Sequence, residues 1–336
     1  MRSGIASRTT VGPISLVICF RISSSRRLAG MVQTILLKPI LLMKNSLSFL
    51  LLWSVLWPQI SQLRAEKPLP STASAKDGTA IPLFNGKDLS GFYTWLRDTQ
   101  YEDPREVFSV VDGVIRISGD GFGYLATEGE YSDYHLSFEF KWGSRNWRGR
   151  ENKARDSGVF LHATGSDGNS VDGNGAFMAA LECQIMEGCL GDILLIRGLE
   201  KNGTRIHPGI SFQADAKPDE AGQFFWNPEG KQRTLKKWGR LNWIEKSRRW
   251  KDIPGFKSET GANKPIQEWV RVECNCVANN LIIRINGKVV NQANRVFPDR
   301  GKILFQCEGS EIFYRRIELK TSGKNKIIPE NRILLQ

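Results

Sequence analysis

The sequence lacks most of the motifs that identify a known chemistry. It contains neither the GxSxG element of serine hydrolases nor the glycine-rich loop that cradles phosphates. It has only three histidines, and His135 and His207 have no partner at ligand spacing, so we do not expect a histidine-based zinc site. No segment carries a long apolar pattern at helical spacing, which argues against a helical fold.

Acidic residues are absent from residues 1–65, which contain eight Lys and Arg. Within them, Met43-Lys44-Asn45 precedes the apolar run SLSFLLLWSVLW, and the small residue Ala65 follows. This pattern predicts a signal peptide at 43–65, since the run is shorter than the ~20 residues of a membrane-spanning helix. Residues 1–42 are interpreted as a leader extension or a misassigned start. We therefore expect a secreted or periplasmic protein with no membrane anchor after signal cleavage.

The signal peptide also changes the charge argument. The whole chain has 47 basic and 35 acidic residues, a net charge of +12. Without the eight basic residues of 1–65 the counts become 39 and 35, a net charge of +4. A nearly balanced chain gives no electrostatic reason to bind nucleic acid, so no nucleic-acid partner is predicted.

Short alternating segments dominate the chain from Ile81 onward. Asp112-Gly113 and Asn286-Gly287 each lie between two such segments, as in β-hairpins. Many short strands joined by Gly and Asn-Gly turns predict an all-β fold, a two-sheet sandwich or jelly roll. We assign a linker to 66–80, this domain to 81–320, and a tail to 321–336.

Five cysteines follow the signal peptide, an odd number with no zinc-type CxxC pair. Either one disulfide forms in an oxidising compartment, or all five are small buried residues, which we favour. They are Cys183, Cys189, Cys274, Cys276 and Cys307.

Residues 226–251 depart from the strand pattern, because nine basic residues alternate there with four tryptophans. We interpret this segment as an insertion and weigh three roles for it. It could bind nucleic acid, form a sugar-binding rim, or be a surface loop whose tryptophans pack back onto the sandwich. The third is favoured.

Two strands each show polar groups on one face. In RDSGVFLH, alternation puts Asp156, Gly158, Phe160 and His162 on one face, and in AALECQIMEG it puts Glu182 and Gln184 opposite an apolar side. If these strands are neighbours, their polar groups form one patch with a candidate base, a candidate acid and amides for sugar hydroxyls. The alternative is an ordinary solvated sheet face.

Several segments together resemble the 3-keto-disaccharide hydrolase domain family. They are IPLFNGKDLSGF at 81–92, RDSGVFLH, LECQIMEG, the strand pair around Asn286-Gly287, and the closing GKILFQCEGSEIFYRRIEL. The resemblance covers residues 81–320 and implies a jelly-roll sandwich of the concanavalin A-like glucanase type.

The resemblance also implies cleavage of glycosides that are already oxidised to a ketone at C3. Such a ketone acidifies the hydrogen at C2, so a base can remove it while the aglycone leaves from C1, and water then adds to the enone. The route needs a base, an acid, and donors or a metal for the enolate. No cofactor is predicted, and a requirement for a divalent metal stays open. The alternative is a non-catalytic carbohydrate-binding module, and in both cases the partner is a carbohydrate or glycan.

The resemblance, with the strand pattern, gives a set of candidate residues. The catalytic candidates are Glu182 as base or polar anchor, His162 as a second proton-transfer group, and Asp156. Many family members have a histidine at the position of Glu308, so the acid and base assignments stay open. The substrate-binding candidates are Gln184, Arg315, Glu308, Gln306 and Trp142.

Overall fold

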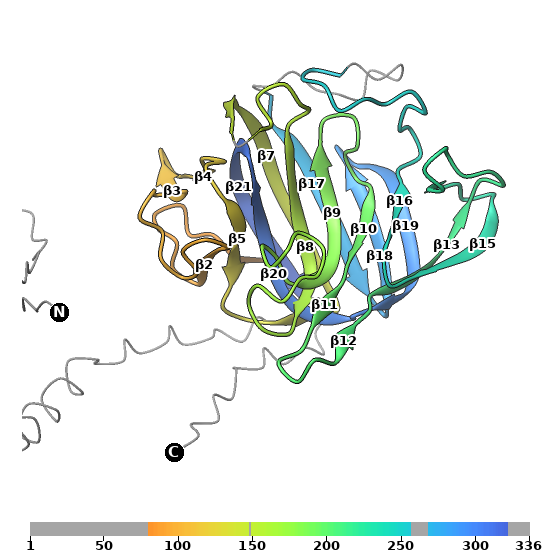
Figure 1. Cartoon of the computed structure of the whole chain (residues 1–336), viewed down its shortest axis with the longest axis horizontal. Coiled ribbons are helices and arrows are strands. Elements are labelled where there is room, and N and C mark those ends of the chain that lie inside the picture. Colours follow the sequence, from red (N-terminus) through yellow and green to blue (C-terminus); the bar gives the residue numbers. More distant parts are fainter. Residues whose placement is uncertain (1–79, 148, 257–267, 322–336) are drawn as a thin grey trace, which may run out of the picture. The chain divides into compact units, whose positions relative to one another are not determined.

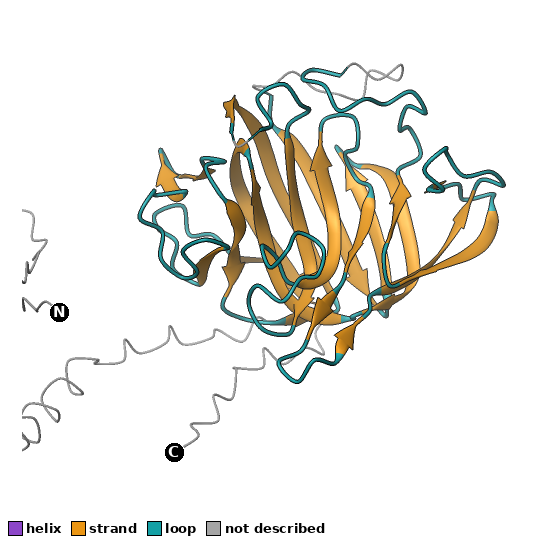
Figure 2. Cartoon of the chain, in the orientation of Figure 1, coloured by secondary structure: helices purple, strands orange, loops and turns teal. Residues whose placement is uncertain are grey.

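The computed structural model describes residues 80–147, 149–256 and 268–321. These residues form strands and loops and contain no helix (Figure 2), so no helix that could cross a membrane occurs among them. The predicted signal peptide, all but the last residue of the predicted linker, and the tail from residue 322 lie outside the described residues.

Two large, almost wholly antiparallel sheets lie one behind the other (Figure 1). The ten-stranded sheet has the order β15 (Lys231–Lys236), β13 (Gly209–Ala214), β19 (Lys288–Phe297), β18 (Asn280–Ile285), β17 (Val270–Val277), β7 (Tyr134–Asn146), β21 (Ser310–Thr321), β4 (Val114–Ile117) and β3 (Phe108–Val111), with β1 (Ala80–Pro82) paired to β21.

The nine-stranded sheet has the order β14 (Phe224–Phe225), β16 (Gly239–Asn242), β10 (Ile193–Ile196), β9 (Ala179–Met186), β8 (Asp156–Thr164), β20 (Arg300–Glu308), β5 (Phe122–Thr127) and β2 (Phe92–Leu96), with β6 (Tyr131–Ser132) paired to β20. A separate small pair is formed by β11 (Gly198–Leu199) and β12 (Arg205–Ile206). The predicted all-β, two-sheet jelly-roll sandwich is confirmed.

One apolar core fills the space between the two sheets. Leu136, Phe138 and Phe140 enter it from β7, and Leu181 and Cys183 enter it from β9. Alternation sends every second side chain of a strand to the same face, so the residues between these lie on the outer faces. The nine-stranded sheet therefore has an inner face toward the core and an outer face that is free to carry a site.

The two predicted hairpins are confirmed. Val111 pairs with Val114 across Asp112-Gly113, and Ile285 pairs with Lys288 across Asn286-Gly287. All four turn residues have positive φ, between 49° and 83°. Two-residue turns with positive φ at both positions match the twist of the flanking strands, and Asn or Asp followed by Gly adopts them most readily.

The favoured interpretation of the cysteines is confirmed. All five cysteines that follow the predicted signal peptide are buried and carry free thiols. Cys183 and Cys274 enter the core from the two opposite sheets, and Cys276 and Cys307 lie in the same core. They act as small apolar residues of the sandwich, and no bridge among them holds the fold together.

Residues 226–251 contribute a strand to each of the two sheets. They supply β15 to the edge of one sheet and β16 to the other, so the segment is part of the sandwich. Trp226 and Trp243 are buried in the core, and Trp250 packs on a small cluster with Met186. The predicted packing of tryptophans onto the sandwich therefore holds for three of the four, and Trp238 is 56% exposed.

We expect Phe305→Ala to lower the free energy of unfolding by about 3–5 kcal/mol, the usual cost of removing a buried phenylalanine. Phe305 is fully buried, and its ring lies 6.0 Å from that of Phe138 and 5.0 Å from that of Tyr314. Urea denaturation would measure the change. Ile253→Ala is the control, since Ile253 is 48% exposed, and equal effects of the two variants would contradict this description of the core.

Candidate active site

Strand pairing gathers the polar residues on the outer face of the nine-stranded sheet. In the pairing of β8 with β9, Asp156 lies opposite Met186, Gly158 opposite Gln184, and Phe160 opposite Glu182. On the other side of β8, Phe305 of β20 lies opposite Val159, and both point into the core. Their neighbours Gln306 and Glu308 therefore share the outer face with the residues of β8 and β9.

Gly158 lies at the centre of this face and, because it has no side chain, leaves space there for a neighbouring residue. A Cβ atom at this position would lie 2.2 Å from Glu182 Oε1 and 2.8 Å from Glu182 Cγ. The carboxyl of Glu182 can therefore lie across β8 only because residue 158 is glycine. This is the close approach that a strand glycine permits.

The polar groups of the face are nearly inaccessible to solvent. Glu182 is 3% exposed, Gln184 4%, Asp156 6% and Gln306 1%, and Glu308 is partly buried. Each of the first four has a side-chain oxygen without a hydrogen-bond partner among the described residues. Buried polar atoms usually have partners, so four unpartnered acceptor oxygens on one face indicate a place for hydroxyl donors or protons.

Arg150 supplies positive charge beside Asp156, with 3.2 Å between Nη2 and Oδ2. The loop before β8 holds this arginine, because its Nη2 also donates to the carbonyl oxygen of Ala154 at 2.7 Å and contacts Asp252 at 3.3 Å. No motif in the sequence points to Arg150. It lies between strands, where alternation carries no information.

Arg240 brings a second positive charge from the far side of β10. Leu194 pairs with both Glu182 and Arg240, so the arginine lies two strands from the glutamate on the same face. Its Nε lies 3.7 Å from Oδ2 of the fully buried Asp192, which also pairs with Lys246 at 2.8 Å. Arg240 belongs to the basic 226–251 segment, and no sequence motif links the charges of that segment to the polar face.

The buried carboxyls hold their protons more tightly than carboxyls in water. Burial raises the pKa of Asp156 to about 6, although Arg150 opposes the shift. Burial and the nearby Asp156 raise the pKa of Glu308 to about 8. Burial, with Glu308 and Asp156 as neighbours, raises the pKa of Glu182 well above its usual range. Three carboxyls in one dry site cannot all ionise, so at neutral pH some act as donors and some as acceptors.

His162 does not join this face, and the prediction that it does is wrong. The register of β8 shifts between Leu161 and Thr164, and His162 has a φ of 56°. Its Nδ1 lies 2.9 Å from the Pro298 carbonyl oxygen, and its ring packs against Tyr134, a core residue. Burial lowers the pKa of this imidazole. The bulge breaks the alternation on which the prediction depended.

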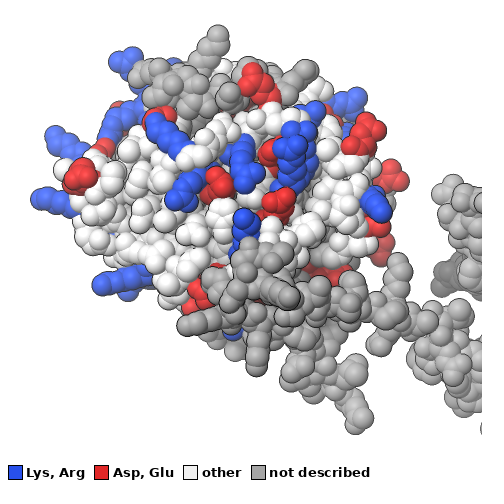
Figure 3. Space-filling model, turned by 180° about the vertical axis from the view of Figure 1, so that it is seen from behind, with Lys and Arg blue, Asp and Glu red and all other residues white. Residues whose placement is uncertain are grey.

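Arg315 and Trp142 also lie elsewhere, which corrects two predicted substrate contacts. Arg315 belongs to the ten-stranded sheet, where its Nε donates to Glu139 at 2.7 Å. Its neighbour Tyr314 points into the core, so Arg315 lies on that sheet's outer face. Acidic and basic side chains are interspersed on the side of the molecule seen in Figure 3. Trp142 points into the core between the sheets, with its ring 5.8 Å from that of Phe140. Neither residue is on the same face as Glu182.

The loop between β8 and β9 covers the other half of the outer face. Its Asp167 accepts hydrogen bonds from three tyrosines, Tyr93 at 2.6 Å, Tyr124 at 2.7 Å and Tyr101 at 2.9 Å. Phe177 of the same loop packs on the outer-face cluster that includes Tyr124. The loop therefore closes one side of the polar patch.

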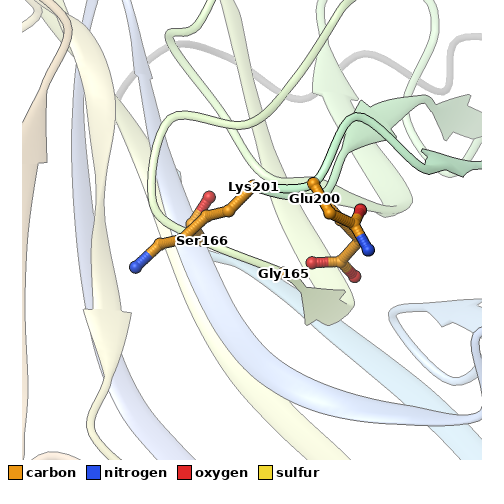
Figure 4. A pocket seen from close by; sticks show the side chains of 5 residues that line it. Gly165, Ser166, Glu200 and Lys201 are labelled. Atoms are coloured by element: carbon orange, nitrogen blue, oxygen red, sulfur yellow. The ribbon is translucent and has the colours of Figure 1, made fainter. Parts of the chain in front are cut away.

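A separate hollow lies at the opposite end of β8 (Figure 4). It is lined by five loop residues, of which Gly165, Lys201 and Asn202 are exposed, and it contains none of the polar groups described above. Across residues 80–147, 149–256 and 268–321, no group of three or more His, Cys, Asp or Glu side chains has an arrangement that could hold a metal ion. The carboxyl face is thus the strongest candidate site.

We expect Glu308→Gln to change how stability depends on pH. Folding raises the pKa of Glu308 from 4.5 to about 8. Its contribution to the free energy of unfolding is therefore fully present below about pH 4.5 and is lost as the pH rises through 8, because the folded state holds a proton that the unfolded state has already released. The variant lacks this loss. The free energy of unfolding of the variant, relative to that of the wild type, should rise by about 3 kcal/mol between pH 5 and pH 9. Each pKa unit is worth about 1.4 kcal/mol, and coupling to the neighbouring carboxyls reduces the total.

Urea titrations at several pH values would measure this difference. Glu318→Gln, which removes an exposed carboxyl on β21, is the matched control and should run parallel to the wild type. A difference between Glu308→Gln and wild type that does not change with pH would contradict the raised pKa.

Comparison with solved structures gives distant matches. A candidate glycosyl hydrolase from Parabacteroides distasonis is 18% identical, with a TM-score of 0.40, and the match covers 72% of this chain and 93% of that one. The Bacillus licheniformis β-glucanase is 11% identical (TM-score 0.36, 74% and 99% covered), and the Bacillus subtilis carbohydrate-binding module CBM66 is 8% identical (TM-score 0.35, 69% and 96% covered). No curated protein matches the chain.

The match to a family model is the informative comparison. A model described as the 3-keto-alpha-glucoside-1,2-lyase-like domain matches residues 79–320, nearly the range over which the sequence motifs predicted it. This range includes both sheets and every residue of the carboxyl face. The chain belongs to the 3-keto-alpha-glucoside-1,2-lyase-like family of carbohydrate-active proteins.

Proposed function

We propose that the protein cleaves 3-keto-glycosides by elimination on the outer face of the nine-stranded sheet, followed by hydration of the product. The observation that carries this proposal is the carboxyl trio around Gly158, formed by the buried Asp156 and Glu182 and the partly buried Glu308. Membership of the family supports the class of substrate. A glycoside-active enzyme needs groups that donate and accept protons in a site shielded from water, and this face has such groups.

The elimination requires two proton transfers. A base removes the proton from C2, the electrons of the C2–H bond form the C1=C2 double bond, and the bond from C1 to the aglycone oxygen breaks. The departing oxygen takes a proton from an acid. Water can then add at C1 to give the free 3-keto sugar, so the sum of the two steps is hydrolysis.

Asp156 is suited to the role of base. Its pKa of about 6 leaves it ionised at neutral pH yet more basic than an ordinary aspartate. Arg150 holds one of its oxygens, and the other, Oδ1, has no hydrogen-bond partner among the described residues. An oriented carboxylate with one unpartnered oxygen can accept a proton from carbon.

Glu308 is suited to the role of acid. Its pKa of about 8 keeps it protonated at neutral pH. Gln306 Nε2 donates to Glu308 Oε2 at 2.6 Å, which fixes one oxygen of the carboxyl and leaves the other available. A neutral carboxyl near its own pKa can protonate a departing alkoxide efficiently.

Glu182 is suited to stabilising the enolate as a neutral donor. Burial raises its pKa well above its usual range, which favours the protonated form. A protonated carboxyl in a dry site can donate a hydrogen bond to the C3 oxygen as negative charge develops there. Gln184 and Gln306, on the neighbouring strands, offer amide groups to the sugar hydroxyls.

The second candidate function is non-catalytic binding of a carbohydrate on the same face. The two buried glutamines favour it, because amides suit hydroxyl groups without any proton transfer. Release of aglycone from 3-keto-glycosides separates the two functions, since a binding module would bind them and leave them intact.

We also propose that the protein is exported through the signal peptide at 43–65. The support for export is the sequence pattern alone. Fractionation of cells that express the full chain, with mass spectrometry of the mature N-terminus, tests it. A product that keeps residues 43–65 would contradict export by this route.

We expect Glu182→Gln and Glu182→Leu to differ in their turnover of 3-keto-glycosides. The amide of Gln still donates a hydrogen bond, whereas Leu cannot, and one donor to a developing oxyanion is worth about 100- to 1,000-fold in rate. Glu182→Gln should therefore lose about tenfold and Glu182→Leu at least 100-fold. The assay measures released aglycone with purified protein in the presence of EDTA.

Glu139→Gln is the control, since Glu139 is a buried carboxylate on the outer face of the other sheet. If Glu182→Gln is as inactive as Glu182→Leu, Glu182 itself transfers the proton. If the wild type releases no aglycone from any 3-keto-glycoside, the elimination proposal is wrong.

We expect kcat/KM to rise with pH through about 6 and to fall through about 8, as Asp156 loses its proton and then Glu308 loses its own. These apparent values belong to the coupled carboxyl trio. Glu308→Gln should slow glycosides of alkyl alcohols strongly and nitrophenyl glycosides little, because nitrophenolate leaves without a proton. Equal losses on both substrates would remove Glu308 from the role of acid.

A further inference from the structure

A second polar cluster adjoins the carboxyl face on the side of β10. The backbone N–H of Gln184 donates to the carbonyl oxygen of Asp192 at 3.0 Å, so Asp192 lies next to Gln184 across the sheet. Because Ile193 enters the core, its neighbour Asp192 points to the outer face. The residues of this cluster are Asp192, Arg240, Asn242 and Lys246. They extend the polar face from β9 toward the edge of the sheet.

Within this cluster the charge of Asp192 is already balanced. Its Oδ1 accepts a hydrogen bond from the backbone N–H of Trp243 at 2.8 Å, and its Oδ2 accepts one from Lys246 Nζ at 2.8 Å. Lys246 also donates to Asn242 Oδ1 at 2.7 Å. One buried carboxylate and one buried ammonium group therefore form a pair, and each oxygen of the carboxylate has a donor.

Arg240 has no such partner. Its Nε lies 3.7 Å from Asp192 Oδ2, beyond hydrogen-bond distance, and its Nη atoms donate to no group among the residues that the structure describes. Arg150, in contrast, lies 3.2 Å from Asp156 and 3.3 Å from Asp252. The Arg240 side chain is only 16% exposed. A mostly buried guanidinium with unused donors indicates a place for negative charge.

The charge of Arg240 acts on the carboxyl face. Its position is opposite Leu194, which is itself opposite Glu182, and its side chain reaches toward Asp192. Burial disfavours the charge of this arginine, yet Asp192, Glu182 and Asp156 raise its pKa above the usual range. The guanidinium is therefore close enough to the carboxyls of β8 and β9 to act on a ligand bound among them.

The proposed elimination creates a negative charge beside Glu182. The order of strands puts Glu308 on β20, Asp156 on β8, Glu182 on β9 and Arg240 on β16, two strands further. The proposed roles of the first three follow the ring of the sugar from the oxygen on C1 to the hydrogen on C2 and the oxygen on C3. When Asp156 takes the C2 proton, the C2–H electron pair forms a C2=C3 bond, and the carbonyl pair moves to the C3 oxygen. A neutral Glu182 gives that oxygen a hydrogen bond but no opposite charge.

We propose that Arg240 is the catalytic cation of this site, and that its guanidinium donates to the C3 oxygen and balances the charge of the enolate. The inference rests on the proposed function. Arg240 stays protonated throughout, and the electron pair returns through C3 to form the C1=C2 bond as the aglycone leaves. The C3 oxygen is uncharged in the substrate and in the enone, so the contact with Arg240 is strongest between them and affects kcat more than KM.

The test compares Arg240→Ala with Arg240→Lys on a 3-keto-glucoside. Arg240→Ala should lower kcat by about 100- to 1,000-fold, the value of one donor to an oxyanion, and change KM by less than about threefold. Arg240→Lys keeps the charge and loses the planar fork, so it should lose about tenfold in kcat. Equal losses in the two variants would overturn the role of the charge.

Chemical rescue separates a catalytic role from a structural one. Guanidinium chloride at low millimolar concentration should raise kcat of Arg240→Ala by roughly tenfold over sodium chloride at equal ionic strength, because it returns the missing charged donor. A lack of response to guanidinium, or a rise in KM at unchanged kcat, would overturn the proposal.

Arg116→Ala is the matched control. Arg116 is a partly buried arginine whose Nη2 lies 2.7 Å from Glu311 Oε1, but its strand, β4, belongs to the ten-stranded sheet. It should leave kcat and KM unchanged and should not respond to guanidinium. The same result for Arg240→Ala would remove Arg240 from the reaction.

Exchange of the C2 hydrogen separates failure of Arg240 from failure of the proposed function. A 1,5-anhydro-3-keto sugar forms the enolate but has no aglycone to lose, and NMR in heavy water measures its exchange at C2. If the wild type exchanges this hydrogen but releases no aglycone from 3-keto-glycosides, elimination is wrong, and Arg240 keeps its role only if Arg240→Ala slows exchange by about 100-fold. If the wild type releases aglycone and Arg240→Ala exchanges as fast as the wild type, only the role of Arg240 falls. Neither exchange nor release by the wild type would remove both.

Discussion

The carboxyl face depends on an absent side chain, the missing Cβ at Gly158. The Glu182 carboxyl occupies that space, with Oε1 only 2.2 Å from where the Cβ would be. This position takes it out of solvent and toward Asp156 and Glu308, its two acidic neighbours. The raised pKa values, the unpartnered oxygens and the division into donors and acceptors all follow from this burial.

Such a face works against the stability of the fold, because buried carboxyls and unpartnered oxygens cost free energy. The surrounding structure offsets part of this cost. Arg150, tied to Ala154 and Asp252, lies beside Asp156, and Arg240 lies between Asp192 and the Glu182 side of the sheet. Buried polar groups that lower the stability of a fold, and that the fold nevertheless holds together in one place, are typical of functional sites.

Alternation in the sequence predicted most of the face, because a strand fixes the side of each residue. Glu182, Gln184 and Asp156 lie together as predicted, and Gln306 and Glu308 join them through β20. Alternation failed at His162, where a bulge changes the side. Arg315 and Trp142 were assigned to the site from a motif. The local pattern does not tell which sheet a strand joins, or which face of that sheet lies at the site. Arg150 and Arg240 required the fold, since Arg150 lies in the loop before β8, where alternation gives no direction, and Arg240 comes from a distant segment.

The acidity of the face bears on the choice between an enzyme and a binding module. A binding module needs hydrogen bonds to hydroxyls, and Gln184 and Gln306 provide these without any ionisation. Three carboxyls with raised pKa values add nothing to such binding that amides would not supply at lower cost in stability. A reaction that takes a proton from carbon and gives one to oxygen, in contrast, requires carboxyls that differ in pKa. Asp156 at about 6 and Glu308 at about 8 differ in this way, one on each side of neutral pH.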